Sequence, residues 1–212
     1  MNPHFISNSL NSVQYLVNSR RYEAANEYIA MMAKLMRKNL DTAGSGFILL
    51  SEEINRLKLY LELEKMRFQD GFTYEMTVGN SVTPEVVLIP NMIIQPFVEN
   101  SLWHGVLNSG RAGLIIISFN FEDVEVKGMI SKCLLIKITD NGVGFVASRK
   151  FKKDDHISKG ILIIEERLNL LSSKLNLPKP IIIEDLSGGS SNSEGAEVII
   201  SLPSPLYKLI TK

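Results

Sequence analysis

The segment PFVENSLWHG, residues 96 to 105, sets three polar side chains, Glu99, Asn100 and His104, among apolar neighbours typical of a buried helix. Phe97, Asn100 and His104 recur every three or four residues and so share one helix face. A buried carboxamide without partners costs about 1 to 3 kcal/mol, so we expect Asn100 to be hydrogen-bonded, bound to a ligand or facing a cavity. The alternative is a partly exposed helix whose polar groups are already satisfied, and this segment alone does not decide between the two.

A second segment, LLIKITDNGVGF at residues 134 to 145, has the alternation of a buried strand. Asp140 falls on the same side as the apolar residues, so its carboxylate is expected to point inward, where it needs a hydrogen-bond donor such as the exocyclic amine of a base. Asn141-Gly142 is also the favoured two-residue hairpin turn, which gives a purely structural alternative. Gly144 weakens that alternative, because two nearby glycines let the backbone approach a flat ligand.

Two further signals concern phosphate chemistry. A helix expected to open at Ser158-Lys159-Gly160 would present free N–H groups to an anion, although one glycine at a helix start is weak support. The basic run SRKFKKDDH before it, residues 148 to 156, is typical of a solvated loop and equally of a lid over phosphates. Near the amino end, His4 lies in a predicted helix, and a neutral imidazole is a competent nucleophile, although a lone helical histidine is usually inert.

The pattern along the chain predicts an α+β fold. Helices are expected at residues 3 to 17, 21 to 40, 51 to 68, 90 to 107 and 159 to 175, with Pro96 kinking the fourth. Strands are expected at residues 74 to 78, 114 to 121, 134 to 139, 181 to 184 and 198 to 202. We therefore predict a helical region, residues 1–68, followed by a two-layer α/β sandwich, residues 69–212, rather than a parallel Rossmann sheet.

Composition narrows the classes of function. The 212 residues are 45% hydrophobic, enough for a real core, and Lys+Arg and Asp+Glu both total 23, so no net field would attract nucleic acid. The single Cys133 excludes an internal disulfide, and the three histidines have no metal-ligand spacing. No leader or spanning segment is expected in this sequence, and the abrupt start at Met1 suggests a fragment of a longer protein.

Taken in order, these motifs resemble the LytS-like sensor histidine kinases. MNPHFISNSLNS is similar to their phosphoacceptor motif, IPNMIIQPFVENSLWHG to the asparagine-containing box, DNGVGF to the first glycine box and KGILIIEERL to the second. LSEEINRLKLYLELEKMRF is similar to the family's linking helix, so the resemblance spans nearly the whole chain. It implies a helical dimerisation region followed by an ATP-binding domain of the GHKL, or Bergerat, type.

The resemblance also implies roles for individual residues. His4 would accept a phosphoryl group from ATP, Glu99 would assist as a polar or basic group, and Asn100 would coordinate Mg²⁺. The remaining residues would shape the nucleotide pocket: Asp140 for the adenine amino group, Gly142 and Gly144 for its walls, Gly160 for the phosphates, and His104 along the same site. The implied partners are a second copy of the chain and a response regulator receiver domain, with the chain forming the cytoplasmic portion of a bacterial inner-membrane protein and any membrane contact made only through missing upstream segments.

Several positions depart from the family pattern. Trp103 replaces a basic residue, Ser158 replaces a glycine, Ile163 replaces an asparagine, Ala196 replaces a threonine and Ser7 replaces a phenylalanine. These changes affect phosphate grip and lid closure, so they keep a nucleotide-binding pseudokinase open as an alternative. A GHKL serine kinase or an ATP-driven clamp is a second alternative, for which His4 would have no role.

Overall fold

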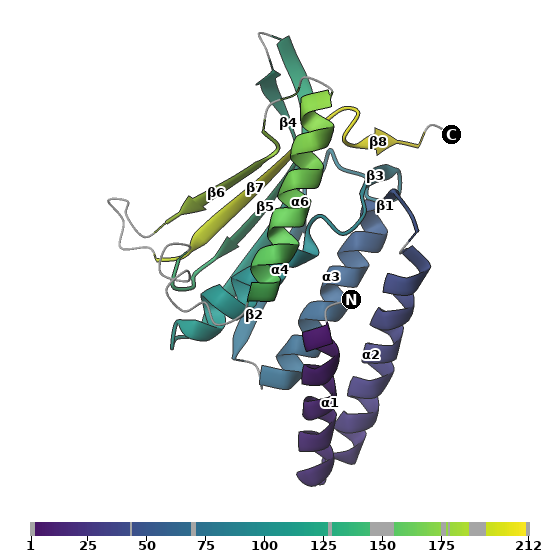
Figure 1. The fold of residues 1–212 in the computed structure, drawn as a ribbon, viewed down its shortest axis with the longest axis vertical. Helices are drawn as coiled ribbons and strands as arrows, with labels where there is room; N and C mark the ends of the chain where they lie inside the picture. The colour runs from purple at the N-terminus through teal and green to yellow at the C-terminus, as the bar shows by residue number, and fades with distance from the viewer. Residues whose placement is uncertain are drawn as a thin grey trace.

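The computed structural model describes residues 3–42, 44–68, 71–126, 129–144, 155–174, 177, 179–186 and 194–210. Three helices come first: α1 (Pro3–Asn18), α2 (Tyr22–Thr42) and α3 (Leu50–Phe68). Arg20, with φ at 59°, makes the turn that sends α2 back along α1 (Figure 1). Ala25, Tyr28 and Leu35 recur at helical spacing on the buried side of α2, so the packing of this apolar face stabilises the helical region.

A five-stranded mixed sheet follows, in the order β2-β4-β5-β7-β6. Its strands are β2 (Phe72–Val78), β4 (Gly113–Val126), β5 (Met129–Asp140), β6 (Ile181–Asp185) and β7 (Ala196–Pro203). Among the residues that the structure describes, β2 and β4 are parallel and the other neighbours in this sheet are antiparallel. Helix α6 (Asp155–Lys174) lies over one face of the sheet (Figure 1), and its buried Ile161, Ile164 and Leu168 share a core with the strands. The predicted α+β architecture is confirmed.

A second, small sheet has the order β1-β3-β8. It is formed by β1 (Phe47–Leu49), β3 (Val87–Pro90) and β8 (Lys208–Leu209), all antiparallel. Because β1 lies between α2 and α3, its pairing with β3 connects the helical region to the middle of the chain. The pairing of β3 with β8 connects both to the end of the chain. The division into two regions at residue 69 stays a prediction. No helix in the described ranges has the length and apolar character needed to cross a membrane.

Three sequence expectations need correction. The helix predicted from residue 90 to 107 is instead the end of β3, a turn with φ at 64° at Met92, and then α4 (Gln95–Asn100), a π-helical turn (Ser101–Gly105) and a 3-10 turn (Val106–Asn108). Pro96 therefore lies in the first turn of α4, where a missing N–H costs little, and it does not kink a helix. The short strands β1, β3 and β8 were not predicted.

The third correction concerns α6, which begins at Asp155 rather than at Ser158. Only the first four N–H groups of a helix are free, so Gly160 lies too far inside α6 to present one to a phosphate. A Cβ added at Gly160 would lie 3.9 Å from the Cβ of Pro96, so this glycine instead brings α6 close to α4. The basic run before the helix lies, up to residue 154, outside the described residues.

Candidate functional site

Asp140 ends strand β5 and is 4% exposed, so its carboxylate points inward as the strand pattern predicted. Its Oδ1 accepts a hydrogen bond from the backbone N–H of Gly142 at 2.9 Å. Burial raises the pKa of Asp140, while hydrogen bonds from the Ser101 hydroxyl and the N–H groups of Gly142 and Ala196 oppose that rise. These neutral donors leave the carboxylate able to accept a further donor from a ligand.

Glycines surround this carboxylate because the backbone comes too close for a side chain. A Cβ at Gly105 would lie 2.8 Å from Asp140 Oδ1, and one at Gly142 would overlap the backbone of Gly105. Gly144 and Gly195 have φ at 83° and 142°, which other residues rarely adopt. The hairpin alternative at Asn141-Gly142 is wrong, since β5 pairs with β4 and β7 and its turn to β4 lies at the opposite end.

Two side chains hold the turn after Asp140 in place. Asn141 Oδ1 accepts from the N–H of Leu114 at 2.7 Å, and its Nδ2 donates to the carbonyl of Ala112 at 3.0 Å. Arg111 donates from Nε to the carbonyl of Asn141 at 3.0 Å and from Nη2 to that of Gly142 at 3.1 Å. Sequence reasoning missed Arg111, because nothing local marks an exposed arginine as a partner of backbone thirty residues away.

The asparagine-containing segment reaches the same place from the helix side. Asn100 ends α4 and is half-buried, and the next residue, Ser101, bonds Asp140. His104 lies in the π-helical turn, and the N–H of Val143 donates to the carbonyl of Gly105 at 3.3 Å. Irregular helical turns of this kind are frequent at functional sites. The structure thus brings together the segments that carry Asn100, Asp140 and Gly144, and it adds Ser101 and Gly105, which the sequence analysis did not select.

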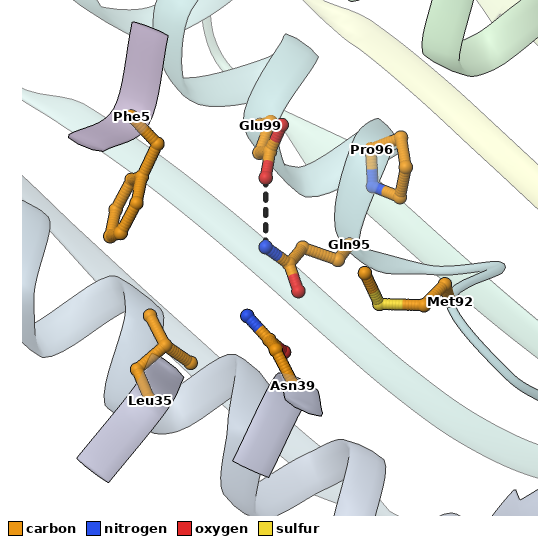
Figure 2. A pocket seen from close by; sticks show the side chains of 7 residues that line it. All are labelled: Phe5, Leu35, Asn39, Met92, Gln95, Pro96 and Glu99. Atoms are coloured by element: carbon orange, nitrogen blue, oxygen red, sulfur yellow. Dashed lines mark hydrogen bonds between the residues drawn. The ribbon is translucent and has the colours of Figure 1, made fainter. Parts of the chain in front are cut away.

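The face of α4 that carries Gln95 and Glu99 borders a cavity of about 160 Å³. Figure 2 shows Glu99 and Gln95 on one side of it and residues of the helical region on the other. Gln95 Nε2 donates to Glu99 Oε1 at 2.8 Å, and burial raises the pKa of Glu99. The lining residues are Phe5, Leu35, Asn39, Met92, Gln95, Pro96 and Glu99.

This cavity connects Glu99 with the start of α1. Phe5 directly follows His4 in the first turn of that helix, and the ring centroids of Phe5 and Tyr60 are 6.0 Å apart. His4 is part of α1, but its side chain lies outside the described residues. Phe5, the residue after the predicted acceptor, and Glu99 therefore lie on facing walls of one small space.

The residues present fit a magnesium nucleotide. A buried carboxylate framed by glycines suits a flat base with an amine, and the half-buried Asn100 offers a carboxamide oxygen near the same turn. Within the described ranges no group of three His, Cys, Asp or Glu could hold a metal alone. In nucleotide sites Mg²⁺ is usually held by one or two protein side chains together with phosphate oxygens and water.

Comparison with known proteins gives matches over most of the chain. Residues 1–72 match the family model described as Histidine kinase. The Sensor protein LytS of Staphylococcus haemolyticus (strain JCSC1435) is 31% identical over 68% of this chain and 23% of its own length. The Sensor histidine kinase BtsS of Escherichia coli (strain K12) is 30% identical over 66% of this chain and 23% of its own length.

Among solved structures, a mycobacterial sensor histidine kinase, MprB, aligns with a TM-score of 0.44 and 18% identity, covering 74% of this chain and 95% of that one. The LytS alignment runs over 144 residues, more than the family model matches, so it extends into the five-stranded sheet. The aligned part is less than a quarter of these curated relatives' length. On these sequence matches, the chain belongs to the LytS-like sensor histidine kinases.

Proposed function

We propose that this chain is a kinase core that transfers the γ-phosphoryl group of Mg-ATP to His4 and then to an aspartate of a response regulator receiver domain. The observation that carries the proposal is the cavity that places Glu99 opposite Phe5, the residue after His4. The buried Asp140 with its glycine surroundings supports nucleotide binding nearby, since a carboxylate at this position suits the adenine amino group.

In the proposed reaction a nitrogen of the His4 imidazole bonds to the γ-phosphorus while the bond from phosphorus to the bridging oxygen breaks and ADP leaves. The imidazole must be neutral to attack, and the N–H on its other nitrogen becomes more acidic as positive charge develops. Glu99 would accept a hydrogen bond from that N–H, which stabilises the charge. Mg²⁺ on Asn100 and the phosphates would neutralise the charge spread over the transferred group.

The proposed partners follow from the helical region. Leu10, Val17, Tyr22 and Ile29 are exposed on α1 and α2, and exposed apolar side chains on neighbouring helices suit packing against a second copy. We propose a homodimer through these helices and phosphotransfer to a receiver domain. The names of the relatives as sensor proteins support a role in two-component signalling, with this chain as the cytoplasmic portion of an inner-membrane protein.

Incubation with γ-labelled ATP and Mg²⁺ tests the proposal. The expected result is an acid-labile label on the wild-type chain and none on His4→Gln, with both proteins binding ATP equally. A chain that binds ATP but takes up no label would support the pseudokinase alternative. The exposed Ile163, at a position where asparagine is usual, favours this alternative. Label that persists in His4→Gln would support a kinase acting on another residue, such as a GHKL serine kinase.

A further inference from the structure

We propose that Arg67, held against the ring of Trp103, binds the terminal phosphates of ATP. The inference rests on the proposed function, because it names a group that neutralises phosphate charge at that site. Residues 95–108, the segment that carries Asn100, contain no lysine or arginine. Because cationic side chains commonly assist Mg²⁺ in neutralising a phosphoryl group, we looked for one that another element brings to this segment.

Arg67 lies in the last turn of α3 and stacks on two aromatic rings. Its Cζ is 4.5 Å from the centroid of the Trp103 ring and 4.9 Å from that of the Phe68 ring. The two rings meet edge to face, with their centroids 5.2 Å apart. Stacking on a ring face fixes a guanidinium and leaves the N–H groups at its edge able to donate. Trp103, which departs from the family pattern, thus positions a cation from α3.

Trp103 also determines which part of the site this cation faces. It is three residues after Asn100 and four after Glu99, so the three side chains share one face of the helical segment. In the proposed reaction the phosphates lie between Asn100, which holds Mg²⁺, and His4, which Glu99 assists. A phosphate chain along this face passes the ring of Trp103, and the guanidinium of Arg67 lies against that ring.

Aromatic side chains connect the same place with the start of α1. Trp103 Nε1 donates to the hydroxyl of Tyr60 at 3.3 Å, and the ring centroids of Tyr60 and Phe5 are 6.0 Å apart. Phe5 directly follows His4. Arg67 and the helix that carries the proposed acceptor therefore contact one row of rings, which is the placement that a phosphate-binding cation needs.

The alternative is that Arg67 serves only to compensate the buried Glu64. Its Nη1 is 3.6 Å from Glu64 Oε2, which is longer than a hydrogen bond, and that oxygen has no hydrogen-bond partner among the described residues. The side chain of Arg67 is also 19% exposed. A guanidinium that served a carboxylate alone would pair with it through two short hydrogen bonds. The N–H groups of Arg67 are therefore not taken up by Glu64 and remain available to an anion.

The experiment compares wild type, Arg67→Met and Arg67→Met/Glu64→Gln. The double variant also removes the buried carboxylate, so it avoids an uncompensated charge if Arg67→Met alone fails to fold, and Glu64→Gln is its reference. Arg37→Met, on the exposed side of α2, removes one positive charge elsewhere and is the matched control. Each protein is titrated calorimetrically with ATP and with AMP, which lacks the terminal phosphates. EDTA is present, so that Mg²⁺ does not contribute to the affinity.

We expect ATP to bind roughly 10- to 100-fold more weakly to each Arg67 variant than to its reference, because a charge-assisted hydrogen bond is lost. The affinity for AMP should be unchanged, as should both affinities of Arg37→Met. Unaltered ATP affinity, or equal weakening for ATP and AMP, would overturn the inference. If ATP binding depends on Arg67 but wild type takes up no label with Mg-ATP, the proposed phosphoryl transfer fails and the inference stands. A wild type that binds no ATP would overturn both.

Discussion

At the scale of single residues, the site depends on a carboxylate that the fold has buried without a cationic partner among the hydrogen bonds described for it. Asp140 is satisfied by Ser101 and by two backbone N–H groups, all neutral. A charged acceptor in such surroundings binds a neutral donor more strongly than a neutral acceptor does. The residue therefore suits the recognition of an amine on a ligand and not merely the ending of a strand.

Replacement of Asp140 by asparagine tests this recognition. Asp140→Asn keeps the size but removes the charge and puts an NH₂ where an acceptor is needed. Hydrogen bonds to charged groups contribute about 1.5 to 3 kcal/mol, so ATP should bind roughly 10- to 100-fold more weakly. Calorimetric titration with ATP measures this, and Asp123→Asn, on an exposed part of β4, is the control. Equal ATP affinity in Asp140→Asn and wild type would remove Asp140 from the nucleotide site.

At the scale of elements, α3 is unusual because it buries acidic groups as well as apolar ones. Glu64 is 1% exposed, and desolvation raises its pKa to about 7, although Arg67 lies 3.6 Å away and opposes this. The folded state therefore binds a proton that the unfolded chain releases near pH 4.5. The resulting stability is fully present below pH 4.5 and is lost as pH rises through 7.

We expect Glu64→Gln to remove this loss. At 1.36 kcal/mol per pKa unit, the variant should gain roughly 3 kcal/mol over wild type at pH 8.5 and little at pH 4.5. Urea unfolding at both pH values provides the free energies, with Glu52→Gln on the exposed side of α3 as the control. A wild type whose stability does not fall between pH 5 and 8 would contradict the assignment.

The elements also show what sequence can predict. Strands β4, β5 and β7 were predicted over part of their length, because short alternating runs divided by turn residues are typical of strands. Strands of two to four residues, such as β8 and β3, carry no period, and they form only because distant segments supply their partners. The left-handed turn lies at Met92, a non-glycine residue, so nothing in the sequence indicated that the helix begins only after this turn.

The candidate site likewise contains residues that the sequence predicts and residues that it does not. Glu99, Asn100 and Asp140 stand out because polar residues interrupt an apolar period. Gly105, Arg111 and Gln95 act through contacts with distant or unexpected partners: Gly105 against Asp140, Arg111 against the turn after β5, and Gln95 against Glu99 at the cavity. Sequence spacing shows which residues share a face of a helix or strand, but it does not show which other element that face contacts.

At the scale of the whole molecule, one buried network joins the helical region to the rest. Arg56 of α3 pairs with Glu53 and donates to Thr42 of α2 and, at 3.1 Å, to Asn91 before α4. Glu53 in turn accepts hydrogen bonds from the backbone N–H groups of Ile94 and Gln95, at the start of α4. The start of the helix that carries Glu99 is thereby hydrogen-bonded to α3, so a shift of the helical region would act on α4.

Asn91 also connects this network to α6, because Arg167 of α6 donates to the carbonyl of Asn91 at 3.0 Å.

Removing one partner of a buried ion pair typically costs 3 to 5 kcal/mol, so Arg56→Met should lower the free energy of unfolding by about that amount. Glu53→Gln/Arg56→Met should lose less than the sum of the two single changes. Urea unfolding measures this, with exposed Arg37→Met as the control; strictly additive losses would show that the pair is not coupled.

The most direct test of the central claim, that Glu99 assists phosphoryl transfer to His4 across the cavity, is the single-turnover labelling rate of Glu99→Gln. General-base and charge-stabilising groups contribute about 10²- to 10⁴-fold, so we predict a rate at least a hundredfold below wild type at saturating Mg-ATP, with unchanged ATP affinity. A variant that labels His4 at the wild-type rate would contradict this role of Glu99.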